Sequence, residues 1–194
     1  MAVNVNIAVD IAALYERFFG MRPLRFDVAN APDQQTNGKY GTPLTATDKL
    51  GRVYWMPVQI GPSNSELMQL SFPTVSIEAS VTNVDTYLTE RQGSVSQYIY
   101  QNNIVIRVRG LIVGQNKQWP EEEIAALNDL KVKGVPMVLK CALTDIFLLH
   151  ESRQGNDTVI INDLQLPNQR GDIKVQPYEL VLSSNEHFNL EEIE

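Results

Sequence analysis

The first regular pattern in the chain is a stripe of hydrophobic residues near its N-terminus. Its members recur at spacings of four, three and four residues: Ile7, Ile11, Leu14 and Phe18. This spacing follows the 3.6-residue period of an α-helix and predicts an amphipathic helix over residues 5–19. Gly20 fits the position just after a helix end, and Pro23 follows it. Two interpretations stay open: the stripe packs on its own domain, or it docks on a partner as a candidate interface.

A long segment rich in turn-forming residues follows the predicted helix. Residues 27–50 contain asparagine, glycine and proline at many positions, including Asn37, Gly38 and Pro43. Loops of this length are uncommon in compact domains unless they have a function. We therefore predict that residues 1–50 form a helix and an extended loop, a candidate docking arm. Residues 51–194 are predicted to form the main β-rich domain.

From residue 51 onward the pattern changes to short runs of β-forming residues. The predicted strands are 53–56, 67–72, 75–81, 86–91, 95–100, 104–109 with its continuation 111–113, 135–141, 158–166 and 176–183. The run 104–109 alternates hydrophobic residues with Arg107 and Arg109, so one face is expected in the core and the other is cationic. Gly110 is expected to break this strand. Gln92 and Gly93 are expected to turn the chain between two of the strands.

One helix is expected among these strands, over about residues 120–131. Pro120 suits the first turn of a helix, where no backbone donor is needed. Three glutamates follow it, and Lys131 and Lys133 lie at the other end, so both sets of charges match the helix dipole. The helix dipole explains the three glutamates, so we do not interpret them as a metal site. The predicted fold class is therefore mainly β (α+β), a small β-barrel or sandwich with one inserted helix and an N-terminal amphipathic helix.

Charge and composition exclude several classes of function. The 194 residues carry a net charge of −7, and residues 1–70 hold six basic and six acidic side chains, so the excess lies in residues 71–194. An acidic excess argues against nucleic-acid binding, which needs cations. The apolar runs are far shorter than the roughly 20 residues of a membrane helix. The start of the chain lacks the basic region of a signal peptide. We expect no membrane insertion, and synthesis in the cytoplasm.

The residues that usually carry chemistry are few. The one cysteine, Cys141, lies in an apolar run and is expected to be a buried, inert thiol. Two histidines, His150 and His187, leave little material for a metal site. Neither a nucleophile elbow nor a glycine-rich phosphate loop occurs. We predict a protein that is not an enzyme, with no catalytic residues, no metal and no cofactor.

Arg107 and Arg109 are the one polar feature with a defined geometry. Two residues apart on a strand, they share a face. In one interpretation they pair with Glu78 or Glu90 on neighbouring strands of a solvated sheet. In the other they form a subunit interface, where arginine is enriched.

A second set of candidates is aromatic. Trp55, Tyr98 and Tyr100 are candidate members of an exposed stacking surface, and the two tyrosines are expected to share one strand face. Such a surface is typical of a module that binds carbohydrate or peptidoglycan. This is the alternative function that the sequence leaves open.

Residues 86–192 resemble a known family in several short motifs. The motifs are 89–97 (TERQGSVSQ), 104–112 (IVIRVRGLI), 119–124 (WPEEEI), 159–167 (VIINDLQLP) and 182–186 (LSSNE). Their order and spacing are similar to those of small β-rich baseplate and tube-junction proteins of contractile phage tails and phage-like contractile injection systems. The last motif departs from that family, with Ser-Asn where aspartate is usual.

The resemblance implies a structural role. It implies a part in the baseplate, the hub or the tube-to-baseplate junction, assembled in the cytoplasm into a phage-like particle. The implied partners are other tail, tube and baseplate subunits in a symmetric ring or wedge. It implies no catalytic residues and does not cover residues 1–70.

Overall fold

The chain forms two compact units, Met1–Gln34 and Gln35–Glu194. The computed structural model describes residues 11–20, 36–47, 53–87, 93–114, 118–150, 157–167 and 175–185. The unit boundary therefore precedes the residue-50 boundary expected from the sequence. Ile7, the side chain of Ile11, the Gln92 part of the predicted turn and the acidic tail after residue 185 lie outside the described residues.

In the first unit the described residues form helix α1 (Ile11–Phe19), which agrees with the predicted helix over this range. Gly20 has a φ of 68° and its N–H donates to the carbonyl of Glu16 at 3.0 Å, so it ends the helix as predicted. Leu14 and Phe18 are half-buried. Among residues 13–19 of α1, whose side chains the structure describes, Tyr15 is the fully buried one, and the predicted stripe did not include it.

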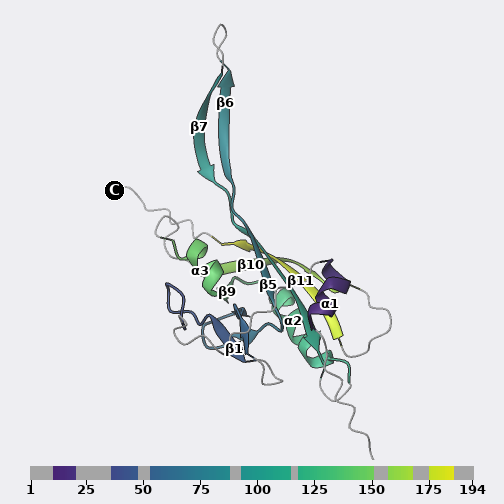
Figure 1. Cartoon of the computed structure of the whole chain (residues 1–194). Coiled ribbons are helices and arrows are strands. Elements are labelled where there is room, and N and C mark those ends of the chain that lie inside the picture. Colours follow the sequence, from purple (N-terminus) through teal and green to yellow (C-terminus); the bar gives the residue numbers. More distant parts are fainter. Residues whose placement is uncertain are drawn as a thin grey trace, which may run out of the picture. The chain divides into compact units, whose positions relative to one another are not determined.

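The second unit is built on a seven-stranded sheet with the order β4-β3-β9-β10-β11-β8-β5 and antiparallel neighbours throughout (Figure 1). Its strands are β3 (Gln59–Gly61), β4 (Met68–Gln69), β5 (Thr74–Glu78), β8 (Val105–Val113), β9 (Met137–Lys140), β10 (Thr158–Gln165) and β11 (Val175–Ser184). Two smaller sheets pair β1 (Thr45–Thr47) with β2 (Val53–Trp55), and β6 (Val81–Tyr87) with β7 (Ser94–Gln101). The mainly β, α+β class is confirmed. In the described residues the main sheet is open, with β4 and β5 at its two edges, and does not show the predicted barrel or sandwich.

Two helices complete the second unit. Helix α2 (Glu121–Lys133) lies in sequence between β8 and β9, which confirms the inserted helix, and α3 (Ala142–Leu148) follows β9. Gly134 ends α2 in the left-handed conformation, with a φ of 61°. Leu127 and Leu130 of α2 join a core cluster with residues of β3, β8, β9, β10 and β11. Both helix leucines therefore contact the face of the sheet that carries Ile106 and Val108.

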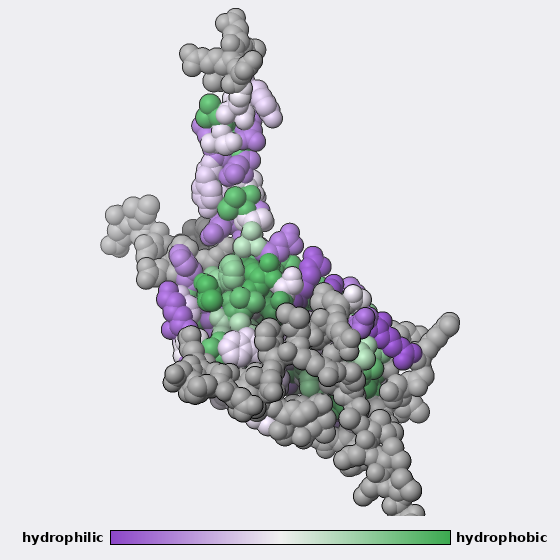
Figure 2. Space-filling model, viewed as in Figure 1, coloured by the Kyte–Doolittle hydropathy of each residue, from purple (hydrophilic) through white to green (hydrophobic). Residues whose placement is uncertain are grey.

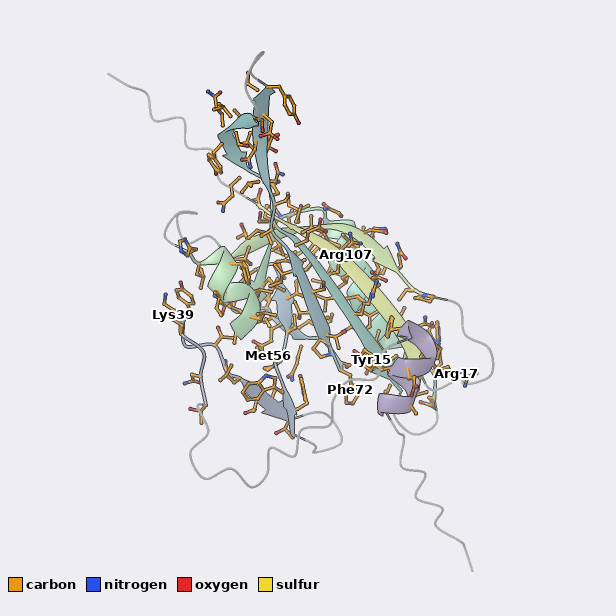
Figure 3. The ribbon with its side chains drawn as sticks, turned by 45° about the horizontal axis from the view of Figure 1, so that its top comes forward. Tyr15, Arg17, Lys39, Met56, Phe72 and Arg107 are labelled. Atoms are coloured by element: carbon orange, nitrogen blue, oxygen red, sulfur yellow. The ribbon has the colours of Figure 1, made fainter. Side chains whose placement is uncertain are left out.

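Several expected strand boundaries are wrong. The strand expected over 75–81 ends at Glu78, and β6 begins at Val81 instead of Thr86. Strand β8 runs through Gly110 without a break because this residue pairs with Tyr178 of β11. Part of the predicted 27–50 loop is a strand, since Thr45–Thr47 pairs with β2. The expected strand 67–72 shortens to β4, and Phe72 adopts a φ of 45°, which turns the chain before β5 (Figure 3).

Close packing between Gly110 and Tyr178 joins the centre of the sheet to its edge strands. A Cβ at Gly110 would lie 2.3 Å from the Tyr178 hydroxyl oxygen and 2.4 Å from ring atom Cζ. The Tyr178 ring is fully buried, and its hydroxyl donates to the carbonyl of Ser71 at 3.1 Å. Ser71 lies between β4 and β5. Glycine is therefore required at position 110 so that the ring can cross β8 and reach this connection.

Gly110→Ala tests this packing. We expect it to lower the free energy of unfolding by about 1–3 kcal/mol, since the added methyl overpacks a closed core. Urea titration followed by circular dichroism measures the loss. In a Tyr178→Leu background Gly110→Ala should cost about 1 kcal/mol less, because the tyrosine hydroxyl and ring atoms that the added methyl group would contact are absent. Equal costs in the two backgrounds would contradict the packing argument.

Candidate functional site

The pair β6–β7, called the ribbon from here on, extends the β5–β8 pair beyond the sheet (Figure 1). Strand β6 follows β5 after two residues, and β7 leads into β8. Asn102 fastens the base of the ribbon. Its N–H donates to the Ser80 carbonyl at 3.0 Å, its side-chain Nδ2 donates to Ser80 Oγ at 3.0 Å, and its Oδ1 accepts from the Thr82 hydroxyl at 2.9 Å. The ribbon is thus a continuation of the sheet's own strands.

The ribbon exposes an unusual number of large hydrophobic side chains. Their exposed fractions are 49 % for Val81, 48 % for Val84, 80 % for Tyr87, 48 % for Val95, 62 % for Tyr98, 50 % for Ile99 and 55 % for Tyr100. Figure 2 shows hydrophobic residues interleaved with polar ones along its length. A two-stranded hairpin alone in water is marginally stable at best. Large exposed hydrophobic side chains gathered on one element are typical of a protein–protein interaction site.

The register of the ribbon separates the two tyrosines that the sequence placed on one face. Tyr98 pairs with Asn83, whereas Tyr100 pairs with Thr82, and the register shifts between these pairs. Ile99 is the extra residue of this β-bulge. Asn83 and Thr82 are adjacent in β6, so their partners lie on opposite faces. The expectation of a shared tyrosine face is therefore wrong.

The ribbon carries almost no charge. The seven residues of β6 and the eight of β7 include one formal charge, Asp85, although charged residues make up 20 % of the chain. The Ser96 hydroxyl donates to Asp85. Among the described residues the outer edges of β6 and β7 are both unpaired. Neutral strands with open edges are usually protected by lysine or proline, and β7 has neither.

The exposure of Tyr98 and Tyr100 was an expectation from the sequence, whereas the exposure of β6 was missed although the sequence contained a signal for it. Val81, Val84 and Tyr87 recur at every third position of β6. A strand has a period of two, so this spacing distributes hydrophobic side chains over both faces. A strand whose hydrophobic side chains are divided between its two faces leaves some of them exposed when one face packs on a core.

Arg107 and Arg109 lie on the sheet face opposite the core, as the alternation predicted. Arg109 forms an ion pair with Glu179 of β11 at 3.0 Å, and Arg107 lies 3.9 Å from Glu78 of β5 (Figure 3). Glu78 is one of the two partners expected; Glu90 lies outside the described residues. The pairs account for both cations within the sheet, and a role in a subunit interface stays a prediction.

The two ion pairs differ in burial, so removing the arginine of each pair is expected to lower the unfolding free energy by different amounts. Arg109→Ala leaves Glu179 only 16 % exposed and without its cation, so we expect a loss of about 1–2 kcal/mol in unfolding free energy. Arg107→Ala is the matched control on the same strand face and should cost about 0.5 kcal/mol or less, because its pair is long and exposed. Urea titration of both variants measures the difference. The argument fails if Arg107→Ala is the costlier change.

Trp55 does not join the tyrosines. It lies in β2 and is 42 % exposed, and the β1–β2 pair is at the opposite end of the second unit from the ribbon (Figure 1). The aromatic neighbour of the β1–β2 pair is Phe72, whose ring centroid lies 6.4 Å from that of Tyr54. The structure therefore does not bring Trp55, Tyr98 and Tyr100 into one stacking surface.

A buried carboxylate, Asp145, was missed in the sequence. It lies in α3 with 1 % of its surface exposed, and the Thr42 hydroxyl donates to its Oδ2. Its Oδ1 is buried without a hydrogen-bond partner among the described residues. Burial raises the pKa of the Asp145 carboxyl above its ordinary value of 3.8, and the Thr42 hydrogen bond opposes this rise. The signal for it was a single acidic residue within the apolar run 141–149.

Asp145 fastens part of the predicted docking arm to the main unit. Thr42 closes a turn in which its carbonyl accepts from Gly38 N–H at 2.8 Å. A Cβ at Gly38 would lie 3.0 Å from that of Ala142, so this turn packs directly on α3. Residues 36–47 therefore belong to the sheet's own unit and are not a free arm.

The described titratable side chains around α3 include Cys141 and Lys140. Cys141 is fully buried as predicted, and burial raises the pKa of its thiol. Lys140 forms an ion pair with Asp157. Among the described residues, no cluster of three or more histidine, cysteine or acidic side chains is placed to hold a metal ion. No helix in the described part of the chain is long and apolar enough to cross a membrane.

Asp145→Asn should change how stability depends on pH. Because the folded pKa is raised, the folded state binds more protons than the unfolded state above about pH 4, so stability falls as pH rises through this window. Asparagine keeps an acceptor for Thr42 and does not titrate. We expect the variant to gain stability relative to the unmodified chain between pH 4 and pH 7, measured by urea titration at each pH. A pH-independent difference would refute the burial argument.

A family model described as a domain of unknown function (DUF6046) matches residues 69–194. The match begins at the end of β4 and includes β5 to β11, both helices and the whole ribbon. Its description names no activity, ligand or assembly. No curated protein matches the chain.

Proposed function

The chain belongs to the DUF6046 family, and we propose that it is a structural subunit of a contractile injection system or phage tail that acts by protein–protein assembly. Its place would be the baseplate, the hub or the tube-to-baseplate junction, with other tail, tube and baseplate subunits as partners. The five motifs over residues 86–192 support this choice of machine. The ribbon supports assembly as the mode of action.

The exposed ribbon is the observation that carries the proposal. Its hydrophobic side chains lie on both faces of a two-stranded sheet, and its edges are open. Ordering such a hairpin in water loses conformational entropy without burying a matching apolar area. An assembled neighbour that covers the faces supplies the missing burial. Residues that contribute little to the stability of the free subunit then contribute to that of the assembly.

The glycan-binding alternative has less support. It needs aromatic rings on one surface, and the three candidate residues are distributed over two sheets and over both faces of the ribbon. The ribbon also lacks the convergent polar groups of a ligand pocket. Assembly requires neither feature.

The test is a ribbon variant with Tyr87→Ser, Tyr98→Ser and Ile99→Thr in the native producer. We expect the variant to fold with an unfolding free energy within about 1 kcal/mol of the unmodified chain, since all three side chains are exposed. It should be absent from the tail-like particles that contain the unmodified chain. Gradient sedimentation of lysates with detection by mass spectrometry gives the readout.

The matched control is Val132→Ser on α2, an exposed hydrophobic residue outside the ribbon. It should enter particles at the normal level. The proposal is wrong if the unmodified chain sediments at about its own mass of 21.8 kDa in a lysate that contains such particles. Normal incorporation of the ribbon variant would show instead that the ribbon is not the contact.

A further inference from the structure

We propose that the partner of the ribbon is a second copy of this chain, joined edge to edge through β7 across a two-fold axis. The inference rests on the proposed assembly role and names the occupant of one open edge of the ribbon. The resulting sheet has the order β6-β7-β7-β6, with the two β7 strands antiparallel. Such a contact is isologous, so both copies contribute the same set of residues.

Charge distribution favours a second copy. Each chain has a net charge of −7, so most orientations of two copies bring like charges together. The ribbon is the exception, because its described residues carry one formal charge, and that charge is on β6. Strand β7, with the sequence SVSQYIYQ, has none. Two β7 edges therefore approach without like-charge repulsion, whereas two β6 edges bring two copies of Asp85 together.

Backbone chemistry favours an edge contact. The outer edge of β7 is unpaired among the described residues and contains no proline, so its N–H and carbonyl groups are available for a ladder. An added strand satisfies both kinds of group, as in β-strand addition. Strand β7 has polar but no charged side chains, so its serines and glutamines enter the contact without leaving a buried charge.

The edge contact brings the exposed hydrophobic side chains of β7 beside those of the second copy. Val95, Tyr98, Ile99 and Tyr100 lie on β7 and are 48–62 % exposed. In the joined sheet these side chains gain cross-strand neighbours from the β7 strand of the other copy. Val81, Val84 and Tyr87 lie on β6, one strand further from the axis, and are not part of this contact.

Full overlap of the two β7 strands makes a positional prediction. It pairs each residue with the one at the mirrored position, so Gln97 and Tyr98 lie nearest the axis and Ser94 faces Gln101 of the other copy. A cysteine at position 97 then lies about one residue along the strand from the cysteine at position 97 of the other copy. A cysteine at position 94 lies about seven residues, or roughly 23 Å, from its own copy.

Crosslinking of the purified full-length chain tests the inference. Gln97→Cys should give dimers with a short bismaleimide reagent on a denaturing gel. Ser94→Cys, on the same edge but far from the axis, should not. The unmodified chain, whose Cys141 is fully buried, is the reagent control. Sedimentation velocity without reagent should give a species of about twice 21.8 kDa. A chain that remains monomeric at 100 µM, or a Gln97→Cys variant without dimers, overturns the inference.

A charge substitution distinguishes the two edges of the ribbon. Gln97→Lys places two cations beside the axis and should weaken the dimer about tenfold or more. Thr86→Lys adds the same charge on β6 and should leave the dissociation constant within about threefold. A larger effect of Thr86→Lys, or dimers that form only when β6 and β7 cysteine variants are mixed, would indicate a head-to-tail contact and overturn the two-fold arrangement.

The outcome is independent of the lysate experiment. A monomeric chain whose incorporation into particles still depends on the ribbon refutes the second copy and leaves the proposed function in place. A dimer that never enters particles supports the pairing and refutes the proposed function.

Discussion

The packing of one tyrosine ring on one glycine is the contact on which the rest of the second unit depends. Tyr178 and Gly110 are direct cross-strand partners in the nine-residue pairing of β8 with β11. A shift of one residue would move every side chain of β8 to the other face. The ring fits against Gly110 alone, because a Cβ there would clash with it. This contact therefore keeps Ile106 and Val108 in the core and Arg107 and Arg109 outside it.

The ribbon follows from the same register. Strand β8 pairs with β5 on its other side, so the direction in which β6 and β7 leave the sheet is set by strands already fixed in the core. The base is fastened by the hydrogen bonds of Asn102 to Ser80 and Thr82. The outer part has no core of its own. A fastened base with an uncovered outer part fits an element that is completed by another molecule, and its near neutrality is compatible with a molecule of the same kind.

The buried polar contact between Asp145 and Thr42 has a different consequence. It ties a segment distant in sequence to α3 at the cost of a desolvated carboxylate. Replacing such a group by an apolar one is often neutral for stability, so its effect is to specify where the segment lies. Residues 36–47 are thereby part of the folded unit. The candidate docking elements that remain in the described residues are helix α1, the ribbon, and the sheet face that carries Arg107 and Arg109.

The sequence by itself determined the elements whose signals are local. The end of α1 at Gly20, the inserted helix with its dipole-matched charges, and the alternation of β8 all depend on neighbours within a few residues. Tertiary structure decided the rest. From the sequence, Gly110 is expected to break the strand, whereas in the structure it packs against Tyr178 inside the strand. Likewise, Tyr98 and Tyr100 are expected to share a face, whereas the bulge at Ile99 places them on opposite faces. Thr45–Thr47 becomes a strand only beside β2. Each of these depends on a partner distant in sequence, because strand pairing and burial are properties of two segments together.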